Sequence, residues 1–216
     1  MNRPFARRRP AAFTLIELLT VIAVIGILAA IIIATVGRTR LTALQSRSLA
    51  NLRQIGSAVQ LHAADNRNQL PVWHNYSEGK YWWEVLQPYV GADPEIYHSP
   101  AHIEFDASTR DRLAETISYG WNYAVLGRHI GDPGKEGDHR LDITSYPTPS
   151  RTLVAADGSR EASWGFIAAD KAPDPDRYRG RIPSLFLDGH TEARPYAEFT
   201  QIDPWFNPVK VLPPNK

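Results

Sequence analysis

The chain of 216 residues has no cysteine and a single methionine. A disulfide framework and a cysteine-ligated metal site are therefore excluded. The sequence also lacks a Gly-x-x-x-x-Gly-Lys phosphate loop and a Gly-x-Ser-x-Gly nucleophile elbow. Since no motif supports an enzymatic function, we predict that the protein is not an enzyme.

An excess of charge of one sign is also absent, because the formal net charge is +1. Four arginines lie in the first twelve residues with no acid beside them. Without that segment, 20 basic and 23 acidic side chains remain, which gives a net charge of −3. Proteins that bind nucleic acid carry a basic surface, so we expect no nucleic-acid partner.

Charge is missing altogether from the twenty residues Leu18–Gly37. The apolar run begins at Phe13, and Glu17 is the one charged residue in it. Twenty helical residues extend about 30 Å, which matches the hydrocarbon core of a bilayer. A secretory signal peptide has a shorter apolar run, of about 7–15 residues. The segment therefore predicts a helix that spans a membrane.

Glu17 is unusual in such a helix, because a carboxylate at the membrane edge costs on the order of a few kcal/mol unless it is paired or reaches the headgroup layer. The run Phe13-Thr14-Leu15-Ile16-Glu17-Leu18-Leu19, after a basic leader, closely resembles the type IV prepilin family. The resemblance implies that prepilin peptidase cuts between Ala12 and Phe13 and that the new amine of Phe13 is methylated. It also implies that Glu17 pairs with the amine of a neighbouring pilin or pseudopilin subunit during assembly.

One position departs from the family's pattern, since the family usually has Gly before the cut and this chain has Ala12. Ala is the next smallest residue, so we expect cleavage there. The leader arginines favour a cytoplasmic leader, although Arg38 and Arg40 follow the helix. The resemblance implies a single-pass protein of the inner membrane with a periplasmic head. It also implies that the subunit is extracted from the membrane into a filament.

The segment Arg38–Asn66 contains no proline and one glycine, Gly56. Its apolar positions recur every three or four residues with one polar member: Leu41, Leu44, Ser48, Leu52, Ile55, Val59 and Ala63. This spacing predicts an amphipathic helix, continuous with the membrane segment over Phe13–Ala64 and about 78 Å long. The alternative is two helices with a break near Gly37. We expect the apolar stripe to lie on the sheet of the head.

The rest of the chain predicts an α+β head with a short helix at Tyr81–Tyr89. Five candidate strands follow, at Ile117–Tyr123, Thr152–Ala156, Trp164–Ala168, Ser184–Leu187 and Thr191–Ala193. The last two flank Asp188-Gly189, which is a strong hairpin signal. We predict a small, mainly antiparallel sheet packed on the long helix. The predicted domains are 1–12, the leader; 13–37, the membrane half of the helix; 38–66, its amphipathic half; and 67–216, the head.

Several short runs in the head resemble a pseudopilin-like family common in planctomycetes and verrucomicrobia. They are Leu52-Arg53-Gln54-Ile55-Gly56, Leu70-Pro71, Ser118-Tyr119-Gly120-Trp121-Asn122-Tyr123, Ala156-Asp157-Gly158 and Leu185-Phe186-Leu187-Asp188-Gly189-His190. That family often ends with a His, nine further residues and then Asp-Gly; in this chain, Tyr178 stands at the position of the His. Its frequent Cys-Pro-Ser turn is replaced here by His98-Ser99-Pro100. Both departures put any role of those side chains in doubt.

Two groups of residues are candidates for a metal site. His98 and His102 are four apart, but Pro100 between them argues against a helical zinc pair, and we expect loop histidines. Asp157, Asp170 and Asp188 lie in or near Asp-Gly loops of the kind that supplies oxygen ligands to calcium. Major pseudopilins of type II secretion carry a calcium site in the head. The favoured interpretation is that both Asp-Gly pairs are hairpin turns and that the protein has no cofactor.

All six tryptophans lie after residue 66. Trp82-Trp83 and Trp121-Asn122-Tyr123 belong either to the core or to a stacking platform for sugars. Two functions remain open. The first is a structural subunit of a type IV pilus-like or type II secretion pseudopilus filament. The second is a membrane-anchored binding module whose head recognises a polysaccharide or a secreted cargo.

Overall fold

The computed structural model describes residues 14–127, 129–130, 142–159, 164–167 and 173–199. The chain divides into two compact units, Met1–Arg40 and Leu41–Lys216, and helix α1 (Leu15–Asp65) contributes to both. The helix is unbroken at Gly37, so the prediction of one long helix is confirmed and the alternative of two helices is wrong. Its predicted first residue, Phe13, lies outside the described residues.

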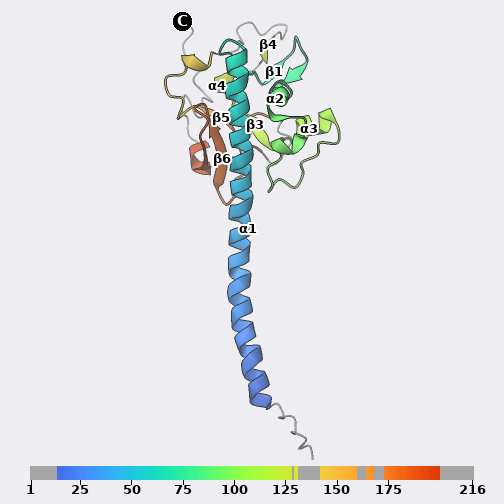
Figure 1. Cartoon of the computed structure of the whole chain (residues 1–216), viewed down its shortest axis with the longest axis vertical. Helices are drawn as coiled ribbons and strands as arrows, with labels where there is room; N and C mark the ends of the chain where they lie inside the picture. Colours follow the sequence, from blue (N-terminus) through green and yellow to red (C-terminus); the bar gives the residue numbers. More distant parts are fainter. Residues whose placement is uncertain (1–13, 128, 131–141, 160–163, 168–172, 200–216) are drawn as a thin grey trace, which may run out of the picture. The chain divides into compact units, whose positions relative to one another are not determined.

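The second unit, the head, contains two small sheets, which confirms the predicted α+β class. One sheet is antiparallel, in the order β3 (Tyr119–Trp121), β5 (Leu153–Asp157), β6 (Arg181–Phe186) and β7 (Thr191–Pro195). The other has the order β2 (Lys80–Tyr81), β1 (His74–Asn75) and β4 (His129–Ile130), and its β1–β4 pair is parallel. Figure 1 shows β3, β5 and β6 beside the head half of α1.

Short helices connect and flank the strands. They are α2 (Trp82–Val90), α3 (Arg110–Thr116), α4 (Tyr123–Leu126) and α5 (Tyr196–Phe199), with 3₁₀ turns η1 (Pro94–Tyr97) and η2 (Ile143–Ser145). The predicted helix at Tyr81–Tyr89 is thus confirmed as α2. Figure 1 shows α2 and α3 together on one side of the head.

Four of the five predicted strands are present. The hairpin at Asp188-Gly189 joins β6 to β7 as predicted, and Gly189 has a φ of 89°, which favours glycine. Strand β3 is shorter than predicted, because the amide of Ile117 still donates to the last turn of α3 and Tyr123 already begins α4. The predicted strand Trp164–Ala168 is wrong over its described part, where Phe166 makes one isolated bridge to Trp121.

The amphipathic stripe of α1 packs into the head as predicted. Leu52, Ile55 and Val59 are buried in one cluster with Leu185 and Leu187 of the β6 region. Burying one such side chain contributes about 1.5–3 kcal/mol. Gly56 marks the closest approach, since a Cβ there would lie 2.6 Å from Leu185 Cδ1.

Ser48, the polar member of the stripe, is fully buried beneath the antiparallel sheet. Its hydroxyl hydrogen-bonds with the Tyr119 hydroxyl of β3 at 3.1 Å. A buried hydroxyl is tolerated when it has such a partner. The single polar position of the stripe therefore ties α1 to the sheet.

Candidate functional site

The first turn of α1 holds Glu17, the predicted assembly residue. Thr14 precedes the helix, and its hydroxyl accepts a hydrogen bond from the Glu17 amide at 3.3 Å. In return, the Glu17 carboxylate accepts from the Thr14 amide at 2.9 Å and from the Thr14 hydroxyl at 2.7 Å. This reciprocal pair is a capping box, which satisfies amides that a helix start otherwise leaves unpaired. The sequence interpretation missed this local role, although the Thr-x-x-Glu spacing was its signal.

The segment that follows Glu17 is apolar and uncovered. One stretch, Leu15–Ile33, is long and apolar enough to cross a membrane, and none of it is buried within the described structure. Its large apolar side chains are between 48% and 83% exposed. Such a surface is stable in lipid or against other apolar helices, so the finding fits a membrane-anchored, single-pass protein.

The head contains a buried ion pair. The carboxylate of Asp157, at the end of β5, accepts a hydrogen bond from the Arg177 guanidinium and another from the Ser99 hydroxyl. Arg177 also donates to the Ser159 carbonyl oxygen at 3.3 Å. Burial raises the pKa of Asp157, while the charge of Arg177 and the Ser99 hydroxyl act in the opposite direction. Removing one member of such a pair leaves the other charged and unpaired, which makes the pair a structural element of the head.

The two positions that depart from the second family's pattern meet at this ion pair. The hydroxyl groups of Ser99 and Tyr178 hydrogen-bond at 2.8 Å, and both side chains are buried. Their proximity could not be predicted from the sequence, because they are 79 residues apart. Both are satisfied polar groups of the interior and not exposed reactive groups.

The predicted calcium ligands are not gathered in one place. The antiparallel register of β5 and β6 puts Asp157 and Asp188 at opposite ends of the paired strands. Asp157 is held by Arg177, and Asp188 accepts from the His190 amide at 3.1 Å within the hairpin turn. Asp170 lies outside the described residues, among which no group of three or more His, Asp or Glu side chains is arranged to hold a metal ion. Calcium binding stays a prediction.

His98 and His102 are loop residues, as expected. The Nε2 atom of His98 lies 3.0 Å from the His102 carbonyl oxygen, and its ring stacks on Phe105. His102 is buried, and its Nδ1 atom lies 2.9 Å from the Ser118 hydroxyl. Burial, helped by the nearby Arg177 charge, lowers the pKa of His102 to about 4.

The tryptophans singled out as a sugar platform belong to the core. Trp82, Trp83 and Trp121 are at most 2% exposed. Trp82 stacks on Trp121 with 5.3 Å between ring centroids, and its indole N–H donates to the Gly165 carbonyl oxygen at 2.8 Å. The platform interpretation of these three tryptophans is wrong and the core interpretation is confirmed, because all three rings are buried in the same core cluster.

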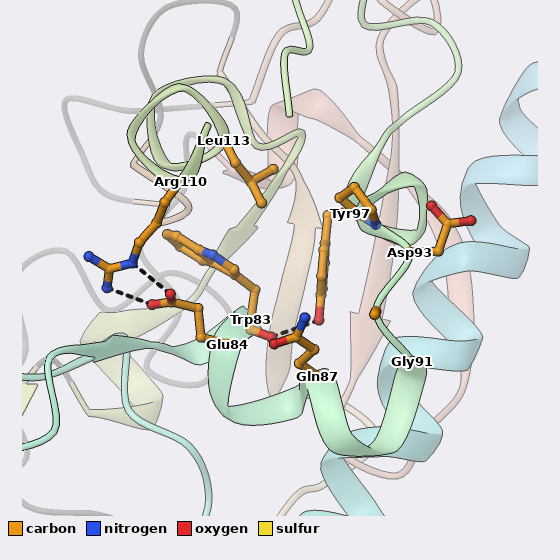
Figure 2. Close-up of a pocket in the computed structure, with 10 residues that line it drawn as sticks. Trp83, Glu84, Gln87, Gly91, Asp93, Tyr97, Arg110 and Leu113 are labelled. Carbon is orange, nitrogen blue, oxygen red and sulfur yellow. Dashed lines mark hydrogen bonds and ion pairs between the residues drawn. The ribbon is translucent and has the colours of Figure 1, made fainter. Parts of the chain in front are cut away.

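A small cleft is lined by residues of α2, η1 and α3 (Figure 2), with a volume of about 220 Å³. At one side, Arg110 donates to both carboxylate oxygens of Glu84, at 2.6 and 2.8 Å. At the other side, the Tyr97 hydroxyl donates to the Trp83 carbonyl oxygen at 2.8 Å. The cleft is below the usual size of a small-molecule site, and its charged groups already satisfy one another.

Comparison with known proteins singles out the N-terminal segment. Residues 7–33 match the family model described as the prokaryotic N-terminal methylation motif. This match confirms the prepilin-like character of the segment, and the head lies outside it. No curated protein and no solved structure matches the chain. The predicted cleavage pair, Ala12 and Phe13, lies within the match but outside the described residues.

Proposed function

We propose that the protein is a structural subunit of a type IV pilus-like or type II secretion pseudopilus-like filament. Prepilin peptidase cuts between Ala12 and Phe13, and the amine of Phe13 is then methylated. The leader is cytoplasmic, α1 is held in the inner membrane, and the head is periplasmic. The match of residues 7–33 to the N-terminal methylation motif supports processing of this kind.

The observation that carries the proposal is the setting of Glu17. It lies at the start of an uncovered apolar stretch, and the partners of its carboxylate within the described residues are the amide and hydroxyl of Thr14. Both donors are neutral, so the negative charge has no compensating positive charge in the described chain. In an apolar environment a cation is a much stronger partner. The methylated amine of a neighbouring subunit is such a cation.

The same geometry explains how copies join. The exposed apolar side chains of Leu15–Ile33 pack against those of neighbouring copies, and each Glu17 fixes the axial position of its neighbour. Pairing with an adjacent copy removes an unpaired charge from the membrane. Assembly therefore needs no chemistry in the head.

The test separates the two roles of Glu17. Glu17→Gln keeps the capping box, because Gln also serves at this position, but removes the negative charge. We expect the variant to insert into the membrane and fold normally, while recovery of an untagged copy with a tagged one falls at least tenfold. Unchanged co-purification would contradict the proposal.

Thr20→Ala is a matched control for this test. The Thr20 hydroxyl donates to the Glu17 carbonyl oxygen at 2.9 Å, so the change removes a polar contact from the same turn without changing charge. Co-purification of this variant should equal that of the unaltered chain. An equal loss in both variants would indicate damage to the helix start and not loss of a charge pair.

A further inference from the structure

The surface of the head carries a row of partly exposed aromatic rings around the β1–β2 hairpin and the segment 164–167. We call it the aromatic row; its members are Trp73, His74, Tyr76, Tyr81, Tyr123, Trp164 and Phe166. Tyr76 is 44% exposed and Trp164 is 37% exposed. Tyr81 stacks on the buried Trp83 with 4.3 Å between ring centroids, so the row forms a partly exposed layer over the tryptophan core.

Neighbouring rings of the row contact one another. His74 contacts Tyr76 with 4.2 Å between centroids and Tyr81 with 4.4 Å. Trp73 contacts Tyr81 at 5.8 Å and Phe166 at 5.0 Å. The contacts therefore run without a gap from one exposed end of the row, at Tyr76, to the segment that carries Trp164. Figure 1 shows the strands β1 and β4 of this region at one end of the head.

The backbone of Trp164 has an unusual conformation. Its φ of 47° lies in the left-handed region, which a bulky residue rarely adopts. Its carbonyl oxygen accepts a hydrogen bond from the Trp73 indole N–H at 2.6 Å. Strained conformations of this kind persist when the surroundings enforce them, and they are frequent at functional sites.

The next residue, Gly165, fixes the segment to the core. Its carbonyl oxygen accepts from the Trp82 indole N–H and from the Trp121 amide, both at 2.8 Å. A Cβ at this position would lie 2.6 Å from Trp83 Cζ3, so only glycine fits. The backbone at Trp164 and Gly165 is thus hydrogen-bonded to Trp73, Trp82 and Trp121, and this anchoring lowers the entropy cost when a ligand stacks on the exposed Trp164.

Polar groups of both signs border the row. Arg110 lies over the Tyr81 ring, 5.4 Å from its centroid, and pairs with Glu84. Lys80 in β2 and Glu78 just before it are exposed and lie 4.0 Å apart. Donor and acceptor side chains therefore flank the rings as charge pairs, and neither sign of charge prevails.

We infer that the aromatic row binds a neutral polysaccharide. The C–H faces of sugar rings pack on the electron-rich faces of aromatic rings, and sugar hydroxyl groups need both donors and acceptors at the border. An acidic or basic polymer would need a border of the opposite sign, which this surface does not have. The inference goes beyond filament assembly and uses head residues alone, so it does not depend on Glu17.

The test uses the full chain in lipid nanodiscs, without glycoside detergents, which would compete for the site. The probes are cellohexaose, mannohexaose and chitohexaose, measured by isothermal titration calorimetry. We expect at least one of them to bind, and Trp164→Ala to weaken that binding at least tenfold. Tyr76→Ala should weaken it about threefold. Ile103→Ala is the control, because Ile103 is 93% exposed elsewhere on the head, and its affinity should be unchanged.

Trp164→Gly guards against misfolding, since glycine accepts the positive φ of this position. It should lose binding to the same extent as Trp164→Ala while the thermal unfolding midpoint is retained. Failure of all three probes to bind, or full affinity in both Trp164 variants, would overturn the inference. Self-association that Trp164→Ala abolishes, without sugar binding, would overturn it in favour of a second copy of this chain. Glu17→Gln should lose assembly and keep sugar binding; unchanged assembly in this variant would contradict the proposed function and leave the sugar-binding inference standing.

Discussion

Ile25 and Ile55 are the same residue type in the same helix, yet Ile25 is 58% exposed and Ile55 is completely buried. The difference lies in what covers each half of α1. The head half packs on the chain's own sheet, whereas the stretch Leu15–Ile33 has no cover within the described residues. Apolarity alone thus does not distinguish a core helix from a membrane or assembly helix. The pattern does, because the head half alternates apolar and polar faces.

The largest expected effect comes from the pair Ile55→Ala and Ile25→Ala. Ile55→Ala leaves a cavity in the core and should lower the free energy of unfolding of the head by about 2–5 kcal/mol. Ile25→Ala should leave that quantity unchanged. Denaturant unfolding followed by tryptophan fluorescence reports the head alone, because all six tryptophans lie after residue 66. Equal destabilisation by both changes would contradict the comparison.

A smaller change in the stability of the head is expected when a glycine in each half of α1 is replaced. A Cβ at Gly56 would meet Leu185, whereas a Cβ at Gly26 has nothing within 4 Å. Gly56→Val should therefore destabilise the head by about 1–3 kcal/mol through overpacking. Gly26→Val should not change head stability, and the same fluorescence measurement applies. If Gly56→Val were neutral, the close approach of α1 to β6 would be wrong.

The smallest expected effect is a dependence of the stability of the head on pH. The pKa of His102 is lowered to about 4 in the folded head, against about 6.5 in an unfolded chain. Between these values the unfolded state binds a proton that the folded state does not, so stability falls as the pH drops from about 6.5 towards 4. We expect a loss of about 1 kcal/mol at pH 5, reduced by solvent screening.

His102→Gln should remove this component, which would appear as a flatter dependence of the unfolding midpoint on pH. The membrane half of α1 has no histidine, so the dependence should be the same for the full chain in detergent or in nanodiscs. A profile identical to that of the unaltered chain would show that the pKa of His102 is the same in the folded and unfolded states, which would contradict the prediction.

Features that depend on local sequence were predictable. The spacing from Leu41 to Ala63 predicted the buried face of α1, and Asp188-Gly189 predicted the β6–β7 turn, since periodicity and turn chemistry are local properties. The apolar stretch Leu15–Ile33 and Glu17 could be identified from the sequence for the same reason, because they too are local features.

Features that depend on distant residues were not predictable. Asp157 was assigned to a turn or to calcium, and its actual partner, Arg177, is 20 residues away. The segment at Trp164 has the composition of a strand, but consecutive positive φ values at Trp164 and Gly165 prevent one. The indole N–H groups of Trp73 and Trp82 hold these conformations by donating to the carbonyl oxygens of Trp164 and Gly165. No local sequence pattern predicts these hydrogen bonds.

Mass spectrometry of the mature protein from the membrane shows whether the N-terminal segment is processed as in a prepilin. We expect a chain that starts at Phe13 and carries one added methyl group on its N-terminal amine. A chain that still begins at Met1, or one cut after Val36, would contradict this prediction.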